Sequence, residues 1–592
     1  MHSRNKTSLV PTLVHYSAFS FCFRNTISSL NGEWSHMKNT LTTLFLGEND
    51  ITEVSGDQPD HISKPSHGLR QFKSLIWLNL DGNRIYKIHK HSLPLTLQTA
   101  SISHNLIENF PLEVVAGLPH LQWLYLRGNH IRSLPEHTFG RKLWLEKIDL
   151  GENYLKSLPR HPFNGSVYIR DLNLAFNDFR TLQSEGFSGL QCGRIILSYN
   201  ALEGVEIGAF DGIQETLEYL DFDHNNFQQI PQALSQLKSL KYLYLSSNML
   251  TEIPERAFEN FCSSLKAVSL SGNRLTRIPA ETLQNCSKIS HFNIGFNEIY
   301  EVGESDFSGW GYNIKSLILG NNRITSLRSQ IFADLQQLKE LSLSFNPLRV
   351  IDGGAFAGLD GLESLEVSFG FDREDLPHEI FKPLTNLKWL SLDNNNFNTV
   401  PEFSLDSLSE LKYLNIESNK VRVVPVNLLK PAVHGKLKDV RLSNNEITTI
   451  RTNTFKSLNS LETILLANNR IKAIEADSFN DLPALNKLIL SDNLIAKLDN
   501  RAFSNLPSLT KLDLHNNYLA DFSFRYFANV STPLHLNLSR NQISSCNAEF
   551  KILNVDVIDL RYNNMARVPR CVEILRTLLT DRFYLQRVIL FT

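Results

Sequence analysis

Residues 485–509, LNKLILSDNLIAKLDNRAFSNLPSL, contain the pattern that decides the fold. Apolar residues and one asparagine recur in this stretch at Leu485, Leu488, Leu490, Asn493 and Ile495. Between residues 487 and 490 the leucines alternate with other residues, which is the period of a strand with one buried face. The stretch therefore predicts a short strand that ends in a turn at the asparagine.

The same pattern recurs along most of the chain. After a first gap of 34 residues, its asparagine returns every 22 to 26 residues, and Gly370 stands in place of one asparagine. A coil of about 24 residues cannot bury its apolar side alone, whereas stacked coils bury a continuous core. The spacing therefore predicts a solenoid of about 22 coils over residues 41–569. The strands of successive coils run in the same direction, so they are expected to join one parallel sheet on the concave side.

Two further positions complete the repeat. A phenylalanine recurs ten residues after the asparagine, as at Phe455, Phe479 and Phe503, and a proline recurs six residues after it, as at Pro135 and Pro159. The combined pattern, LxxLxLxxNxLxxLPxxxFxxLxx, resembles the "typical" class of leucine-rich repeats, which is common in extracellular and cell-surface proteins. The resemblance implies an α/β-type solenoid, a curved horseshoe with a parallel β-sheet on its concave side and mostly irregular convex segments.

The two ends and one insertion depart from the repeat. We expect residues 1–40 to form a poorly ordered segment or a partial cap, residues 52–72 to contain a loop insertion, and residues 570–592 to form a capping or truncated segment. Neither a signal peptide nor a lipid-anchor signal is evident, and no apolar run is long enough to span a membrane. Contact with a membrane is therefore expected only through an anchor that this chain does not contain.

Six cysteines are too few for a disulfide framework. Cys262 and Cys286 each stand three residues before the first leucine-type residue of their coil, so stacking places them at equivalent positions of adjacent coils. A disulfide needs a Cα separation of about 4.4–6.8 Å, and convex segments fan apart, so both the bonded and the free state stay open. Cys546 and Cys571 flank the last coil and could staple its C-terminal end. No cysteine or histidine group has zinc-ligand spacing, so no metal site is expected.

Asn-x-Ser/Thr triplets make glycosylation candidates if the chain is secreted. The candidates are Asn164, Asn285, Asn529 and Asn537. Asn164 and Asn529 lie in segments expected on the convex side, where a glycan is easily carried. Asn537 lies between two core leucines, so a glycan there would block part of the concave surface.

The outward strand positions form the natural binding surface, because the repeat holds them rigidly and spaces them regularly. Aromatic residues, which are typical anchors of protein interfaces, gather among these positions at Trp77, Trp123, Tyr125, Tyr219, Tyr242, Tyr244, Trp389 and Tyr413. The alternative interpretation is that these rings pack on one another across neighbouring strands. Charges of both signs share this surface and the net charge is -2, which argues against a nucleic-acid partner.

Nothing in the sequence indicates catalysis. It contains no nucleophile elbow, no glycine-rich phosphate loop and no segment outside the repeats long enough for an enzyme domain. We therefore expect a non-enzymatic protein without a cofactor, which recognises other proteins at the cell surface or outside the cell.

Stretches such as FKPLTNLKWLSLDNNNF at residues 381–397 and LHLNLSRNQIS at residues 534–544 are similar to those of arthropod photoreceptor adhesion proteins. This similarity implies cell adhesion by contact with a second copy. A ligand-binding receptor ectodomain of the Toll-like kind and an intracellular scaffold are the alternatives.

Overall fold

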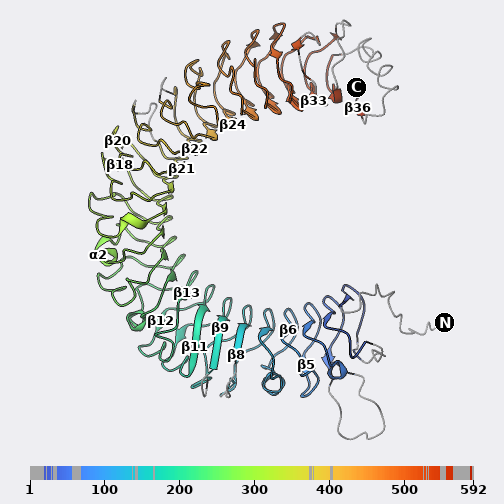
Figure 1. Ribbon diagram of the computed structural model, residues 1–592, viewed down its shortest axis with the longest axis vertical. Coiled ribbons are helices and arrows are strands. Elements are labelled where there is room, and N and C mark those ends of the chain that lie inside the picture. The colour runs from blue at the N-terminus through green and yellow to red at the C-terminus, as the bar shows by residue number, and fades with distance from the viewer. Residues whose placement is uncertain are drawn as a thin grey trace, which may run out of the picture. The chain divides into compact units, whose positions relative to one another are not determined.

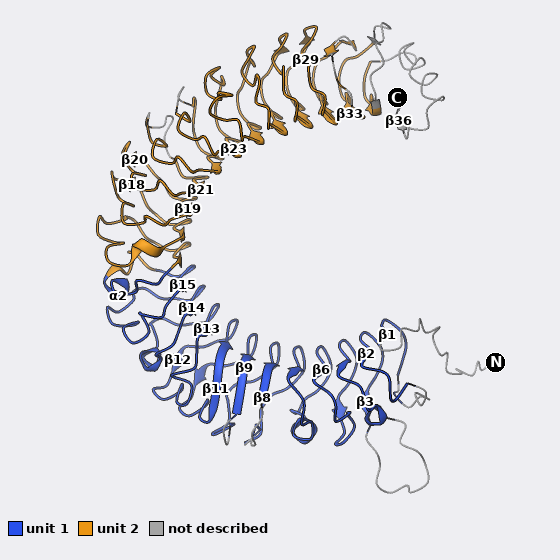
Figure 2. Ribbon diagram, in the orientation of Figure 1, with its two compact units in different colours: residues 1–274, 281–289 blue, residues 275–280, 290–592 orange. Residues whose placement is uncertain are grey.

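The computed structural model describes residues 19–21, 23–28, 30, 37–55, 68–136, 138–139, 144–163, 167–371, 377, 379–400, 404–523, 526–528, 530, 532–546, 555–564 and 587–589. The chain divides into two compact units (Figure 2). Unit 1 comprises residues 1–274 and 281–289, and unit 2 comprises residues 275–280 and 290–592. Both units are built from the same repeated coil.

Unit 1 has one parallel strand for each coil. Neighbouring strands pair in register, so that Tyr219 lies opposite Tyr242 and Leu220 opposite Leu243. The strands are β1 (Phe19–Phe21), β2 (Thr43–Phe45), β4 (Trp77–Asn79), β6 (Thr99–Ser101), β7 (Trp123–Tyr125), β8 (Trp144–Asp149), β9 (Val167–Asn173), β11 (Leu190–Ile196), β13 (Tyr219–Asp221), β14 (Tyr242–Tyr244) and β15 (Ala267–Ser269). Within the unit they line the inner side of an arc (Figure 1).

Unit 2 repeats this arrangement. The parallel register runs from His291 opposite Ser316 to Val557 opposite Arg587. The strands are β16 (His291–Asn293), β17 (Ser316–Ile318), β19 (Glu340–Ser342), β21 (Ser364–Glu366), β22 (Trp389–Ser391), β23 (Tyr413–Asn415), β24 (Asp439–Arg441), β25 (Thr463–Leu465), β27 (Lys487–Ile489), β30 (Lys511–Asp513), β33 (Leu534–Asn537), β35 (Val555–Asp559) and β36 (Arg587–Ile589). These strands also lie on the inner side of the unit.

The outer side of each coil holds only short elements. Within the described ranges six two-stranded pairs form there: β3 (Glu53–Val54) with β5 (Lys87–Ile88), β10 (Thr181–Leu182) with β12 (Gly204–Val205), β18 (Ser326–Leu327) with β20 (Val350–Ile351), β26 (Ala473–Ile474) with β28 (Lys497–Leu498), β29 (Phe503–Ser504) with β32 (Phe527–Ala528), and β31 (Asp521–Phe522) with β34 (Ser545–Cys546). The helices are one or two turns long: η1 (Leu69–Gln71), α1 (Leu112–Val115), η2 (Gln232–Gln236), α2 (Ala280–Leu283) and η3 (Gly311–Asn313). The predicted fold class, a parallel solenoid with mostly irregular convex segments, is confirmed.

The asparagines join neighbouring coils through buried hydrogen bonds. The Asn493 amide donates to the Leu466 carbonyl of the preceding coil at 2.9 Å and to the Leu490 carbonyl of its own coil at 3.2 Å. Its side-chain oxygen accepts a bond from the Ile471 N–H at 3.1 Å. Because an unpaired buried polar group costs about 1–3 kcal/mol, this amide is a structural residue and not a binding group.

Gly370 occupies the asparagine position of its coil and forms a hydrogen bond through its backbone. Its backbone carbonyl accepts a hydrogen bond from the Leu348 N–H at 2.8 Å, which is the role of the asparagine side chain in other coils. A Cβ at this position would lie 2.7 Å from Cγ1 of Val367. The close approach favours glycine, and the backbone carbonyl replaces the acceptor of the missing asparagine side chain.

Two strands lie in the segments that the sequence assigned to the ends. β1, within residues 1–40, pairs with β2 through Phe19 opposite Thr43, and β36, within residues 570–592, pairs with β35. In the expected insertion at residues 52–72, β3 and η1 are described and residues 56–67 lie outside the described ranges.

Candidate protein-binding surface

The eight predicted aromatic residues all lie on strands of the concave sheets, but they do not form one patch. Trp77, Trp123, Tyr125, Tyr219, Tyr242 and Tyr244 belong to unit 1, and Trp389 and Tyr413 belong to unit 2. Within unit 1 the three tyrosines of β13 and β14 come together. We call Tyr219, Tyr242 and Tyr244 the tyrosine cluster.

The tyrosine cluster is a direct consequence of the register. Because Tyr219 lies opposite Tyr242, and Asp221 opposite Tyr244, the three rings share one face of two adjacent strands. The Tyr219 ring centroid lies 6.0 Å from that of Tyr242 and 5.1 Å from that of Tyr244. The guanidinium of Arg194 on β11 lies 4.1 Å from the Tyr219 centroid, which is a cation–π contact. All three rings stay partly exposed.

Two carboxylates border the tyrosine cluster. The Asp223 N–H donates to Asp221 Oδ1 at 3.0 Å, and the Ser198 hydroxyl donates to Asp221 Oδ2 at 3.2 Å. Burial and, to a smaller extent, the negative charge of Asp221 raise the pKa of Asp223 to about 6. Burial also raises the pKa of Tyr219 to about 12, against the lowering effect of Arg194. The cluster is thus an aromatic surface bordered by an acid whose pKa is raised to about 6.

The stability of unit 1 is expected to fall as the pH rises from about 4 to 7, through Asp223. Its pKa is raised in the folded state, so the native chain takes up the proton before the unfolded chain as pH falls through about 6. The stabilisation by this bound proton is complete near the unfolded-state pKa of about 3.9 and is lost above the folded-state pKa of about 6. Asp223→Asn keeps an oxygen acceptor for the Ser246 N–H and should raise stability at pH 7.5 by about 1 kcal/mol after solvent screening.

Urea unfolding at pH 5.0, 6.0 and 7.5 measures this effect. The matched control is Asp178→Asn, which removes an exposed carboxylate of unit 1 and should leave the pH profile unchanged. An Asp223→Asn chain with the same pH slope as the parent would show that this carboxyl does not carry the dependence.

In unit 2 the two predicted aromatic residues, Trp389 and Tyr413, pack against each other. The Trp389 and Tyr413 rings stack with centroids 3.5 Å apart and planes at 11°, and the Arg441 guanidinium lies 4.9 Å from the Tyr413 centroid. Tyr413 is buried at 9% exposed, whereas Trp389 is 40% exposed. Tyr413 therefore follows the alternative interpretation of ring packing, and Trp389 is the residue that a partner can reach.

The remaining predicted aromatics lie in unit 1. Trp77 is 45% exposed and packs against Phe45 with ring centroids 5.2 Å apart. Trp123 and Tyr125 share β7, and the Lys147 ammonium lies 5.7 Å from the Tyr125 centroid. These three residues lie on β4 and β7, which other strands separate from the tyrosine cluster, so they are separate candidate contacts.

A second row of exposed aromatics was missed by the sequence reasoning. Each of these residues directly precedes the asparagine position of its coil and has a positive φ: Phe176, Tyr199, Phe296, Phe345, Phe369 and Tyr562. Phe176, Tyr199 and His224 stack in sequence with centroids 4.2 and 4.0 Å apart. Phe-Asn or Tyr-Asn marks five of these residues in the sequence, and Phe369 precedes Gly370, so an aromatic residue directly before the asparagine position is the signal that could have found them.

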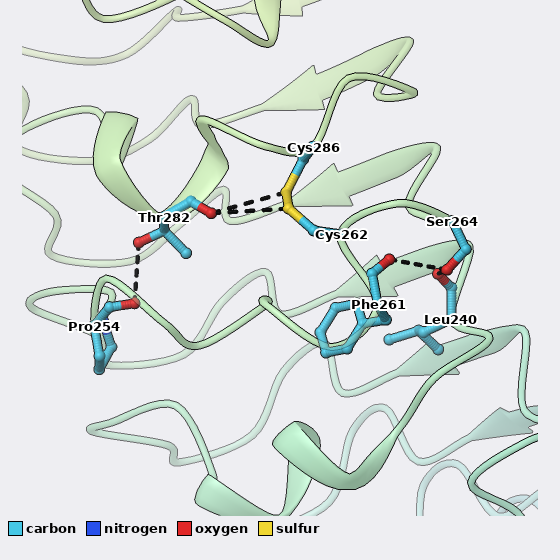
Figure 3. Close-up of a disulfide and its surroundings, with 7 residues drawn as sticks. All are labelled: Leu240, Pro254, Phe261, Cys262, Ser264, Thr282 and Cys286. Atoms are coloured by element: carbon cyan, nitrogen blue, oxygen red, sulfur yellow. Dashed lines mark hydrogen bonds between the residues drawn. A yellow bond between two sulfur atoms is a disulfide. The ribbon is translucent and has the colours of Figure 1, made fainter.

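Cys262 and Cys286 form a disulfide with Cα atoms 4.5 Å apart (Figure 3). The bond joins adjacent coils of unit 1, and the Thr282 hydroxyl on the same segment donates to the Pro254 carbonyl at 3.0 Å. Cys192 is free and buried, and burial raises its pKa to about 12, so it behaves as a core residue. Cys571 lies outside the described residues, so its pairing with Cys546 stays a prediction.

Two of the glycosylation candidates are described. Asn285 is exposed in the turn beside Cys286, and Asn537 lies on β33, where its side-chain oxygen accepts a bond from the Ser539 hydroxyl at 2.8 Å. Asn164 and Asn529 lie outside the described ranges.

No helix within the described ranges is long and apolar enough to cross a membrane. Among those same residues, no three histidine, cysteine, aspartate or glutamate side chains group as metal ligands.

The repeat geometry agrees with a known family profile. The family described as "Leucine rich repeat" matches residues 73–131, 193–250, 244–299, 313–369, 374–421, 435–495 and 460–519, which together make up more than half of the chain. The chain belongs to the leucine-rich-repeat family. Members of this family generally serve as non-enzymatic interaction scaffolds, so protein recognition fits the fold.

Curated relatives match this leucine-rich-repeat chain over part of their length. Mouse podocan is 26% identical over 260 residues, which are 43% of this chain and 36% of podocan. Lumican of Coturnix japonica is 30% identical over 172 residues, 28% of this chain and 49% of lumican. Chicken Toll-like receptor 2 type-2 is 34% identical over 103 residues, 17% of this chain and 11% of the receptor. The chain thus matches about half of these relatives' length or less.

Solved structures share the fold. Mouse RP105, solved in complex with MD-1, superposes with a TM-score of 0.56 at 21% identity, over 80% of this chain and 82% of that one. Drosophila Toll, solved in a complex with Spatzle, gives a TM-score of 0.55 at 19% identity, over 74% of this chain and 66% of that one.

Proposed function

We propose that this leucine-rich-repeat chain is a non-enzymatic recognition protein that binds other proteins through the outward side chains of its concave strands. The observation that carries the proposal is the tyrosine cluster, with Arg194 and Asp223 at its border. Its rings are fixed on rigid strands, so they lose little conformational entropy on binding, and tyrosine and arginine are the residues enriched in binding hot spots.

We further propose that the chain acts in cell adhesion by contact with a second copy, in the manner of chaoptin, the arthropod photoreceptor adhesion protein. Charge complementarity supports self-contact. Unit 1 presents Asp221 and Asp223, whereas Lys487 lies opposite Lys511 on adjacent strands of unit 2. Like charges that face one another across strands are unfavourable within the fold, and an acidic surface on another molecule would offset that cost.

The cell-surface part of the proposal is supported by the disulfide between Cys262 and Cys286, because such bonds persist in oxidising compartments and are rare in the cytosol. The exposed triplet at Asn285 is consistent with glycosylation. Secretion from arthropod cells followed by glycosidase treatment tests this part. A mobility shift is expected, whereas an unglycosylated cytosolic chain would favour the scaffold alternative.

A Toll-like receptor ectodomain is the second candidate function. The observation that favours it is the 34% identity with chicken Toll-like receptor 2 type-2. Beads coated with the folded, glycosylated chain separate the two candidates. Self-adhesion predicts that the beads cluster, and beads that stay dispersed would remove self-adhesion and leave a soluble ligand or a different partner as the target.

A further inference from the structure

A hollow on the concave face of unit 2 carries an exposed aromatic rim. The hollow has a volume of about 430 Å³ and lies over β17, β19, β21 and β22. Its rim is formed by Phe296, Phe345 and Phe369, which are 62%, 48% and 51% exposed, together with Trp389. Phe345 and Phe369 stack with centroids 4.5 Å apart at 12°. We call these four residues the aromatic rim.

The fold does not account for the aromatic rim. Phe296, Phe345 and Phe369 have φ of 53°, 58° and 49°, the left-handed region that bulky side chains rarely adopt. Several other coils of unit 2 place small polar residues at the equivalent position, as at Ser418 and Asn444. Exposed aromatic rings that contribute nothing to the core and occupy an unfavourable backbone conformation indicate an interaction surface.

The hollow is also negatively charged. Asp393 accepts hydrogen bonds from the hydroxyls of Ser368 at 2.5 Å and Ser391 at 2.6 Å. Burial acts to raise the pKa of Asp393, but the bonds from Ser368, Ser391 and Asn394 outweigh it and hold the pKa below its usual value. The carboxylate is therefore kept ionised by hydroxyl and amide donors, which leave its charge uncompensated.

Glu366 adds a second acid beside Asp393. Burial raises the pKa of Glu366, and the charges of Asp393 and Glu340 raise it further. Lys339 and Lys388, on neighbouring coils, pair with Glu363 at 3.2 and 2.5 Å and not with Glu366. Within the described part of the chain, neither Glu366 nor Asp393 forms an ion pair. A cation from outside the chain would complete the site.

We propose that the aromatic rim with Glu366 and Asp393 binds an arginine side chain of a protein partner. A guanidinium can stack on an aromatic face and pair with a carboxylate at the same time, which a lysine ammonium does less well. The hollow lies open on the concave face, so a side chain presented by a folded partner can enter it. The inference rests on the proposed function, since it assumes that a protein meets this face.

Selection of phage-displayed random 12-residue peptides on the immobilised full chain tests this inference. Enriched peptides are expected to contain arginine next to an apolar residue, and replacing that arginine by alanine in a synthetic peptide should weaken binding roughly tenfold or more. Glu366→Gln combined with Asp393→Asn should weaken binding of the same peptide by a similar factor. Enrichment of peptides without basic residues would overturn the proposal, as would an absence of enrichment.

Two further variants separate binding from folding. Phe345→Ser combined with Phe369→Ser removes exposed rings only, so it should preserve thermal unfolding and still weaken peptide binding. Glu304→Gln combined with Asp360→Asn makes the same charge change on exposed residues outside the hollow and should bind like the parent. Equal binding by all variants would overturn the site. Bead clustering without arginine selection would contradict this inference alone, whereas arginine selection without clustering would contradict self-adhesion alone.

Discussion

Beads coated with a chain that carries Tyr219→Ser, Tyr242→Ser and Tyr244→Ser are expected to cluster at least about 30-fold less than beads coated with the parent chain. The three rings occupy two adjacent strands with centroids 5.1 to 6.0 Å apart, and Arg194 lies over one of them. Loss of one hot-spot residue costs about 2 kcal/mol or more of binding free energy, and three neighbouring losses exceed that value. The cluster is thus expected to dominate recognition by unit 1.

The control for the tyrosine cluster uses tyrosines of unit 1 that lie outside the concave strands. Tyr86 and Tyr154 are 52% and 48% exposed, so Tyr86→Ser combined with Tyr154→Ser should leave clustering unchanged. Circular dichroism and thermal unfolding report whether each variant is folded. A folded triple variant that clusters like the parent would show that these rings only pack on one another, the alternative that the sequence left open.

Replacement of Phe479 by alanine is expected to lower the free energy of unfolding by about 3–5 kcal/mol. Phe479 is fully buried, and its ring stacks on Phe455 at 5.8 Å and on Phe503 at 6.2 Å. The substitution leaves a cavity between three successive coils, and a solenoid depends on each contact between neighbours. Guanidinium unfolding of the purified chain measures the loss.

The exposed Phe369 provides the control for Phe479. Phe369→Ala removes the same ring from a position that is 51% exposed, so the change in unfolding free energy should stay within about 1 kcal/mol. Similar losses at Phe479 and Phe369 would contradict the assignment of the phenylalanine series to the core.

Much of the fold could be predicted from the sequence, because a few residue types at fixed spacing determine the coil. Leu488 predicted the inward face of β27, Leu490 predicted the core position directly after it, and Asn493 predicted the hydrogen bonds of the turn that follows. The two-residue strands on the outer side, such as β26 and β28, were expected as irregular segments. They depend on the distance between neighbouring coils, which the residue pattern does not encode.

The candidate surface could be predicted only in part. The sequence identified Trp389 and Tyr413 as outward residues, but only the rotamers show that Trp389 covers Tyr413. The hollow escaped prediction because it depends on the register of β21 and β22, which places Glu366 opposite Ser391. Asp393 and the aromatic rings that line the hollow follow the strands. The state of Cys262 and Cys286 was left open because it depends on how far adjacent coils separate, and their Cα atoms lie 4.5 Å apart.

A glycan placed on the concave or the convex side tests most directly whether the concave strands carry recognition. Ile489→Asn on β27 creates an Asn-Leu-Ser triplet on the concave sheet of unit 2, and Thr452→Asn creates an Asn-Asn-Thr triplet on an exposed turn outside the strands. Both chains can be secreted from arthropod cells behind a supplied signal peptide and coated on beads. Loss of clustering for Ile489→Asn but not for Thr452→Asn is expected. Full clustering by the glycosylated Ile489→Asn chain would contradict recognition through the concave face.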